Sequence, residues 1–182
     1  MGKEFVVGVT GASGIIYARR LLDVLGESAR VHLIISEVAR EIASFEDVNL
    51  DGCRAVYHDV RRMEASFASG SFRHNGMVII PCSMKTLSSL AHGNADNLIT
   101  RAADVTLKER RPCLLVLREM PFNRVHLENM LSAHDAGATV MVASPGFYHH
   151  PKTITDLVDM VVARVLDHLQ VEHNLDVRWE GA

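Results

Sequence analysis

Apolar and polar residues alternate along this chain in blocks that predict strands and helices in turn. Short, nearly continuous apolar runs predict strands at residues 5–10, 31–36, 77–80, 113–117 and 139–143. Helical spacing predicts helices at residues 15–25, 37–45, 83–91, 97–110, 125–136 and 154–169. The last has the clearest period, with apolar residues at i, i+3, i+4 and i+7 and Thr153 as its N-cap. Residues 46–76 show the least pattern and are expected to form a long loop that carries short elements.

Alternation of this kind favours a parallel sheet with helices on both faces. A length of 182 residues fits one domain with a sizeable core. A net charge of -3 gives no general attraction to nucleic acid or to anionic membranes. No apolar run approaches the ~18 residues of a membrane span, and no signal peptide is visible. Three cysteines without a C-x-x-C spacing fit a reducing compartment, so a cytoplasmic protein is expected.

The strand at 113–117 runs directly into Arg118 and Glu119. Open α/β sheets bind ligands at the carboxyl ends of such strands. There an arginine can hold a phosphate and a glutamate can move a proton. The alternative is a surface salt bridge, since exposed pairs are common and individually weak.

The first turn has glycines at positions 8, 11 and 14, after a strand and before a helix. Such a turn suits an anion at the helix N-terminus, as in a phosphate or flavin cradle. The spacing is not G-x-G-x-x-G, and no acidic residue ends the second strand, because Ser36 precedes Glu37. The alternative is a tight turn that needs glycine only for its backbone.

A second helix start follows the strand at 77–80, where Ser83 and Thr86 offer hydroxyl groups and backbone amides. Two helix starts at one sheet edge could hold a flavin ring and its phosphate, although Ser83 could be a simple N-cap. Cys82 is expected in the core and not as a nucleophile.

Basic residues on two helices are further candidates. Arg101, Asp104 and Lys108 share one helix face, where they could equally form a solvated salt-bridge face. Arg164 lies at the edge of the last helix's apolar stripe, so it could reach a buried site or a subunit interface, or extend into solvent.

Two familiar chemistries find no support. Tyr148 and Lys152 match the Tyr-x-x-x-Lys spacing of short-chain dehydrogenases, but Pro151 disfavours the helix that this pair requires. Tyr148 could instead donate to a phosphate. The ten histidines lack any metal-ligand spacing, so no metal site is expected.

Taken together, these segments resemble the flavin prenyltransferases, the UbiX-like family. The matching motifs are Thr-Gly-Ala-Ser-Gly at 10–14, Ala-Ser-Gly-Ser at 68–71, Pro-Cys-Ser-Met-Lys-Thr at 81–86, Arg-Ala-Ala-Asp-Val at 101–105, Leu-Lys-Glu-Arg-Arg-Pro at 107–112, Arg-Glu-Met-Pro at 118–121, His-Leu-Glu-Asn-Met-Leu at 126–131 and Pro-Gly-Phe-Tyr at 145–148. The match runs in order along nearly the whole chain, and only residues 46–67 match poorly.

The resemblance implies a three-layer α/β/α fold of the flavodoxin-like or Rossmann-like type, assembled as a homo-oligomer, often a dodecamer. It also implies a metal-independent transfer of the dimethylallyl group of dimethylallyl monophosphate to reduced FMN. The product, prenylated FMN, would serve UbiD-like decarboxylases in ubiquinone synthesis or in the decarboxylation of aromatic acids.

The resemblance also assigns roles to particular residues. FMN would be held by Gly11, Ala12, Ser13, Ser36, Ser83, Met84, Lys85, Thr86 and Arg118. The prenyl phosphate would be held by Tyr148, Arg164, Lys108, Arg118 and Ser13, several of them from a neighbouring subunit. Glu119 would transfer the proton, with Glu46 and Arg101 in support. Residues from about 168 to 182 would form a tail that closes the site, with Trp179 against the prenyl group.

Two other functions stay open at this point. FMN-dependent cysteine decarboxylases share the first turn, but their Pro-x-Met-Asn-x-x-Met-Trp substrate motif is missing here. A non-catalytic FMN-binding or carrier subunit of an aromatic acid decarboxylase would keep the flavin contacts. It would not need Glu119, Lys108, Tyr148 and Arg164, and all four are present.

Overall fold

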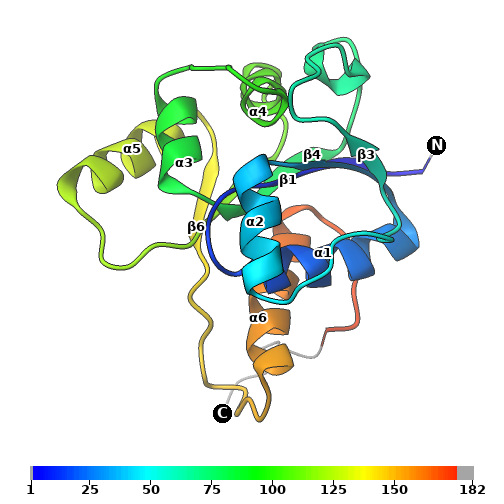
Figure 1. Cartoon of the computed structure of the whole chain (residues 1–182), viewed down its shortest axis with the longest axis vertical. Coiled ribbons are helices and arrows are strands. Elements are labelled where there is room, and N and C mark those ends of the chain that lie inside the picture. Colours follow the sequence, from blue (N-terminus) through cyan, green and yellow to red (C-terminus); the bar gives the residue numbers. More distant parts are fainter. Residues whose placement is uncertain (1, 176–182) are drawn as a thin grey trace.

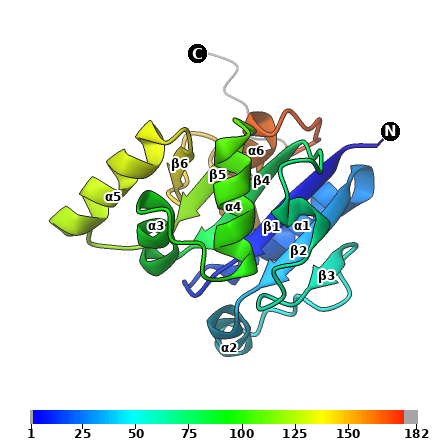
Figure 2. The same cartoon turned by 90° about the horizontal axis from the view of Figure 1, so that it is seen from above.

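The computed structural model describes residues 2–175, which form a six-stranded sheet between two layers of helices (Figures 1 and 2). All strand pairs are parallel, and the strand order is β3-β2-β1-β4-β5-β6. The strands are β1 (Glu4–Val9), β2 (Arg30–Ile35), β3 (Val56–His58), β4 (Gly76–Cys82), β5 (Cys113–Leu117) and β6 (Thr139–Val142). This order is that of the dinucleotide-binding α/β fold, so the Rossmann-like form of the expected three-layer architecture is confirmed.

The helices divide between the two faces of the sheet. They are α1 (Ile15–Ser28), α2 (Glu37–Phe45), α3 (Met84–Ala91), α4 (Leu98–Lys108), α5 (Arg124–Asp135) and α6 (Ile154–His168), with a short 3-10 helix η1 (Ser66–Ala68). Buried residues of α1, α2 and α6 belong to one apolar cluster, and those of η1, α3, α4 and α5 belong to another. Figure 1 shows α3, α4 and α5 on one side of the sheet and α1 and α6 on the other.

Strand β1 shows why the sheet separates these two clusters. Side chains alternate between the faces of a strand. Phe5, Val7 and Val9 therefore join the cluster with α1 and α6, while Val6 joins the cluster with α4 and η1. Every residue of β4 and β5 is buried, as continuous apolar runs predict for central parallel strands.

Most element boundaries differ from those predicted by one or two residues, and α1 and β4 extend furthest beyond the predicted ranges. Helix α1 continues three residues beyond position 25 and passes through Gly26, where an added Cβ would lie 2.9 Å from the Cβ of Arg54. The glycine is therefore explained by a close neighbour and not by a helix end. Strand β4 extends from the predicted 77–80 to Gly76–Cys82 and includes Pro81.

The segment 46–76 contributes one strand to the sheet, β3, which pairs with β2 at the edge. The loop was expected to carry short elements, and β3 and η1 are those elements. None of the helices formed by residues 2–175 combines the length and the apolar character that a membrane-spanning helix requires.

Strand order fixes where a ligand can bind. The chain runs from β1 outward to β2 and β3, then crosses back to place β4 on the other side of β1. Loops after β1 and β4 therefore leave in opposite directions and open a crevice at the carboxyl edge of the sheet.

Candidate functional site

A cavity of about 350 Å³ lies at this crevice, within the size range of small-molecule sites. Segments that follow four neighbouring strands line it. The lining residues are Thr10, Gly11, Ala12, Ser36, Val38, Ser83, Met84, Lys85, Thr86, Ser89, Asn97, Ile99, Thr100, Arg118 and Glu119. The two turns expected to share one sheet edge therefore do so.

Thr10 joins the two central turns of the site. Its hydroxyl group donates to the carbonyl of Pro81 at 2.9 Å and accepts the backbone N–H of Ser83 at 2.8 Å. The side chain is buried, and these two bonds give its hydroxyl group both a donor and an acceptor partner within the protein. The turns after β1 and β4 are thereby held at a fixed separation on either side of the cavity.

Two helices begin at the cavity with a serine cap. Ser36 Oγ accepts the N–H of Ala39 at the start of α2, and Ser83 Oγ accepts the N–H of Thr86 at the start of α3. Among the hydrogen bonds of the described residues, none uses the N–H groups of Met84 and Lys85. First-turn amides of this kind are available to an anionic ligand.

Gly11 allows α2 to approach the first turn closely. A Cβ at this position would lie 2.6 Å from Cγ1 of Val38. A larger residue at position 11 would therefore clash with Val38, which explains the glycine. Gly11 and Val38 both line the cavity.

Arg118 and Glu119 extend from the end of β5 to the cavity, as predicted. Arg118 Nε donates to the carbonyl of Ser13 at 3.2 Å, so the guanidinium group bridges the β5 end and the first turn. Glu119 Oε1 accepts the N–H of Met120 at 3.0 Å. A cation and a carboxylate therefore face one cavity, and this arrangement excludes the alternative of an isolated surface pair.

The N-terminus of α1 departs from the expectation of an anion cradle. Gly14, its N-cap, has a φ of 100°, which glycine adopts without strain. The N–H groups of Gly14 and Ile15 donate to the carboxylate of Glu46 at 2.7 and 2.8 Å. The anion at this helix end is therefore supplied by the protein, and a ligand phosphate must bind elsewhere in the crevice.

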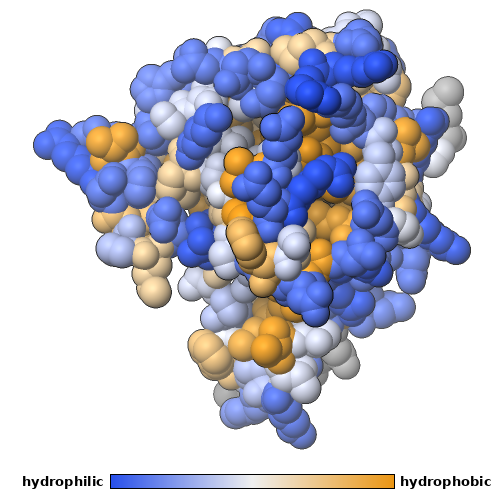
Figure 3. All heavy atoms as spheres, in the orientation of Figure 1, coloured by the Kyte–Doolittle hydropathy of each residue, from blue (hydrophilic) through white to orange (hydrophobic). Residues whose placement is uncertain are grey.

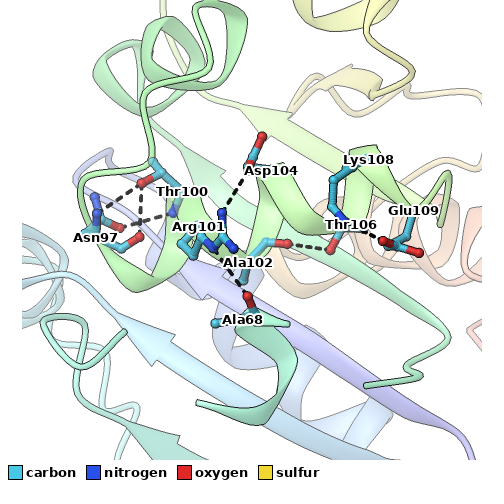
Figure 4. A network of polar contacts seen from close by, with 9 residues as sticks. All are labelled: Ala68, Asn97, Thr100, Arg101, Ala102, Asp104, Thr106, Lys108 and Glu109. Atoms are coloured by element: carbon cyan, nitrogen blue, oxygen red, sulfur yellow. Dashed lines mark hydrogen bonds and ion pairs between the residues drawn. The ribbon is translucent and has the colours of Figure 1, made fainter. Parts of the chain in front are cut away.

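Lys108 and Arg101 lie outside this cavity in a single chain. Figure 4 shows Asn97 and Lys108 near opposite ends of α4, which at 1.5 Å per residue are about 16 Å apart. Lys108 pairs there with Glu109, and Arg101 contacts Asp104 at 3.4 Å and the carbonyl of Ala68 at 3.3 Å. The alternative of a salt-bridge face is therefore realised in part, by Arg101 and Asp104, whereas Lys108 pairs with Glu109.

Arg164 and Tyr148 do not line the cavity either. Arg164 is exposed on α6 and pairs with Asp167 at 3.0 Å. Tyr148 lies in the loop between β6 and α6 with its ring against His149, at 5.7 Å between ring centres. This loop is not helical at Tyr148, in agreement with the argument against a dehydrogenase. Trp179 and most of the expected closing tail lie outside the described residues.

The cysteines offer no nucleophile. Cys82 and Cys113 are fully buried, and burial raises the pKa of the Cys113 thiol to about 12 and that of Cys82 further still. Cys82 is a core residue, as expected. Within residues 2–175, no group of three or more His, Cys, Asp or Glu side chains could hold a metal ion.

Several lining residues were not singled out from the sequence: Thr10, Val38, Ser89, Asn97, Ile99 and Thr100. Asn97 caps α4 by accepting the N–H groups of Ile99 and Thr100. An asparagine followed three residues later by a threonine is an N-cap pattern, and here it marks the start of α4 near the carboxyl edge of the sheet. This pattern could have identified Asn97 and Thr100. The others carry no signal in the sequence, because packing alone brings them to the cavity.

Comparison with known proteins agrees with this geometry. The model of the flavoprotein family matches residues 1–166. A flavin prenyltransferase UbiX of Deinococcus radiodurans is 52% identical, over 97% of this chain and 93% of the relative. The flavin prenyltransferase UbiX of Escherichia coli K12 is 46% identical, over 99% of this chain and all of the relative. The chain belongs to the UbiX family of flavin prenyltransferases.

Solved structures of family members superpose closely on this one. A crystal structure of AnUbiX (PadA1) in complex with FMN and dimethylallyl pyrophosphate has a TM-score of 0.97 and 38% identity over the whole of both chains. A dodecameric FMN-dependent UbiX-like decarboxylase from Escherichia coli O157:H7 has a TM-score of 0.93 and 43% identity, over 98% of this chain and all of the other. The peptidyl-cysteine decarboxylase EpiD, at 16% identity and a TM-score of 0.66, shares the fold alone.

Proposed function

We propose that this chain transfers a dimethylallyl group from dimethylallyl monophosphate to reduced FMN, and that the flavin binds in the cavity at the carboxyl edge of the sheet. The observation that carries the proposal is that Arg118 and Glu119 line the same cavity as the first turn and the start of α3. A flavin carrier needs the turn and the helix start, but it has no use for a carboxylate at the ligand.

The cavity residues fit a flavin phosphate and ring. First-turn amides of α3, with Ser83 and Thr86, offer donors to a phosphate, and Arg118 adds positive charge. Gly11, Ala12 and Ser36 also line the cavity. We assign the flavin contacts to Gly11, Ala12, Ser13, Ser36, Ser83, Met84, Lys85, Thr86 and Arg118.

The residues proposed for the prenyl phosphate come from more than one chain. Lys108 is about 12 Å along α4 from Thr100, the last residue of that helix to line the cavity. Arg164 is near the end of α6, and this end adjoins the amino edge of the sheet, where Lys3 contacts the carbonyl of Gln170. Neither cation lines the cavity of its own chain. We therefore assign Lys108, Arg164 and Tyr148 to a site that they complete in a neighbouring subunit, together with Arg118 and Ser13 of the cavity.

Exposed apolar side chains support assembly. Figure 3 shows hydrophobic side chains at the surface over α2 and α5 and where α6 begins. Phe45, Met120, Phe147 and Ile154 are each more than two-thirds exposed. Exposed apolar residues of this size are typical of interfaces, and the dodecameric relative supports a dodecamer of this chain.

The proposed chemistry assigns three tasks to side chains. Clustered cations stabilise the phosphate as its charge grows during departure. Reduced FMN, when bound, supplies the electron-rich ring to which the allylic carbon joins. Glu119 accepts the proton that leaves the ring, Glu46 holds the first turn in place, and Arg101 holds η1 through the carbonyl of Ala68.

The product would pass to a UbiD-like decarboxylase in the cytoplasm. An alternative prenyl donor is the diphosphate, because the similar PadA1 structure contains dimethylallyl pyrophosphate. The two donors differ by one phosphoryl group, and a direct comparison of their rates separates them.

The test is an anaerobic reaction of the purified protein with FMN, dithionite and either prenyl donor, followed by mass spectrometry of the flavin. The expected result is a mass gain of one prenyl unit, faster with the monophosphate, and loss of that product in Glu119→Gln with flavin binding retained. Flavin that binds but keeps its mass would establish a carrier and overturn the proposal.

A further inference from the structure

Asp167 lies between Arg164 and a buried histidine of the segment that follows α6. Its Oδ2 atom accepts Arg164 Nη1 at 3.0 Å, and its Oδ1 atom lies 3.3 Å from His173 Nε2. The two oxygens of one carboxylate thus bind two different partners. The exposed fraction of the side chain falls from 55% at Arg164 through 30% at Asp167 to 1% at His173.

The hydrogen bonds of His173 define its tautomer. Its Nδ1 atom accepts the backbone N–H of Leu175 at 3.2 Å, so this nitrogen carries no proton. Nε2 then carries the proton and donates it to Asp167. Because both ring nitrogens form hydrogen bonds, the imidazole of His173 is held in one orientation. Its Nε2 in turn holds the Oδ1 atom of Asp167 in place.

The segment that presents His173 is anchored to the core. The N–H of Val171 donates to the carbonyl of Leu166 at 3.0 Å, and the Val171 side chain is buried. Leu175 packs against the same apolar cluster as α1 and α6. His173 is therefore held from both sides, and its contact with Asp167 is not that of a free surface residue.

We propose that Asp167 and His173 are positioning residues, which hold the Arg164 guanidinium group in the orientation that binds the phosphate of the prenyl donor. This inference rests on the proposed function, in which Arg164 binds that phosphate. A guanidinium group has five N–H donors, so a bond from Nη1 to Asp167 leaves others for a phosphate. An arginine that is already ordered loses less conformational entropy on binding than one that moves freely.

The test measures affinity for the donor separately from affinity for the flavin. Asp167→Asn and His173→Asn are compared with wild type by calorimetric titration of isopentyl monophosphate, the saturated donor analogue, into the FMN-loaded oligomer. We expect roughly a three- to tenfold rise in Kd for the analogue in both variants. The reason is that the Arg164 side chain would no longer be ordered before binding, so binding would cost more conformational entropy. The same rise is expected in KM for dimethylallyl monophosphate, with the affinity for FMN unchanged.

Two variants separate positioning from general damage. Asp159 lies on the same helix as Asp167, α6, and forms an ion pair with Arg20 of α1. Asp159→Asn breaks this ion pair and should leave the Kd for the analogue unchanged. His173→Gln places an amide donor where ring Nε2 lies, so it should bind the analogue more tightly than His173→Asn, whose shorter side chain reaches only as far as Nδ1.

The outcomes are distinct from those that bear on the proposed function. If Asp167→Asn and His173→Asn bind the analogue as tightly as the wild type and the control Asp159→Asn do, the positioning role is wrong. The proposed transferase activity would not be affected by that result. If Arg164→Met does not weaken the analogue, Arg164 is not a phosphate ligand and the inference fails with it. If wild type leaves FMN without a prenyl group, the proposed function itself fails.

Discussion

The carboxylate of Glu46 accepts the backbone N–H of Gly14 at 2.7 Å, across 32 positions of sequence. Glu46 is the C-cap of α2, and Gly14 is the N-cap of α1. The contact therefore joins the end of one helix to the start of another and holds the first turn between them. It also places a negative charge at the positive end of α1, where the helix dipole favours it.

Glu46→Gln tests this contact. An amide has one acceptor oxygen where the carboxylate has two, so one of the two N–H groups at the start of α1 loses its partner. We expect a loss of about 1 kcal/mol in the free energy of unfolding, and a melting temperature lower by about 2–4 °C. The exposed Glu64→Gln is the control, and equal melting temperatures for the two variants would contradict the capping role.

Thr10→Val should weaken both the fold and the flavin site. The change preserves shape but removes the hydroxyl group that joins the carbonyl of Pro81 to the N–H of Ser83. The carbonyl of Pro81 keeps the backbone N–H of Thr10 at 3.2 Å, but the part-buried N–H of Ser83 loses its partner. That loss should cost about 1–3 kcal/mol in denaturant unfolding. FMN affinity, followed by flavin fluorescence, should fall as well, whereas Thr10→Ser should behave as wild type.

Gly11→Ala should be destabilising because the new Cβ would lie 2.6 Å from Cγ1 of Val38. Overpacking of this kind costs about 1–3 kcal/mol. Val38→Ala removes the obstructing atom, so the double variant should recover most of the stability that Gly11→Ala loses. A double-mutant cycle of unfolding free energies measures this coupling. If the effects of the two single substitutions simply add in the double variant, the side chain of Val38 is not what destabilises Gly11→Ala.

Hybrid oligomers test whether sites are shared between chains. Lys108→Ala and Glu119→Gln should each abolish most of the prenylation of FMN when alone. If Lys108 of one chain serves the cavity of another, random mixing leaves about a quarter of the sites with both native residues. Unfolding and refolding the two variants together should therefore restore part of the activity.

The control for this experiment mixes two variants whose lesions lie in one cavity, Arg118→Ala and Glu119→Gln. Their hybrids contain cavities with one lesion each, so no activity should return. No recovery in the first mixture would show that Lys108 acts within its own chain or not at all. Recovery in the control would show that Arg118 and Glu119 do not serve the same cavity.

Buried histidines should make the fold less stable in acid. Burial lowers the pKa of His74, and burial followed by the charge of His32 lowers that of His58, below the usual value near 6.5. The unfolded chain therefore binds protons more readily than the folded chain. Stability present above about pH 6.5 should fall as the pH drops toward the folded pKa values and then level off.

Melting temperatures between pH 7.5 and 5 measure this effect. His74→Asn keeps a donor for the carbonyl of Gly76, which His74 Nδ1 contacts at 3.1 Å, but it does not titrate in this range. Its melting temperature should therefore depend less on pH than that of wild type. Equal slopes for the wild type and His74→Asn would contradict the assignment.

The sequence predicted the strands and helices well because most of them have strong apolar periods. The run at 113–117 became β5, and Thr153 caps α6 as expected. The pattern was weak only in 46–76, where β3 has three residues at the sheet edge and little buried surface to reveal it. Arg118, Glu119 and the two glycine- and serine-rich turns could be assigned to one site because parallel strands bring their carboxyl ends to the same edge.

The sequence by itself determined the order of elements, the parallel sheet and the edge at which a ligand binds, since these follow from local periodicity and chain direction. Only the tertiary structure showed that Glu46 occupies the N-terminus of α1 and that Lys108 and Arg164 do not line the cavity of their own chain. The physical reason is that such relationships depend on which surfaces pack together and on the length of each helix. Neither is encoded in the spacing of residues within one segment.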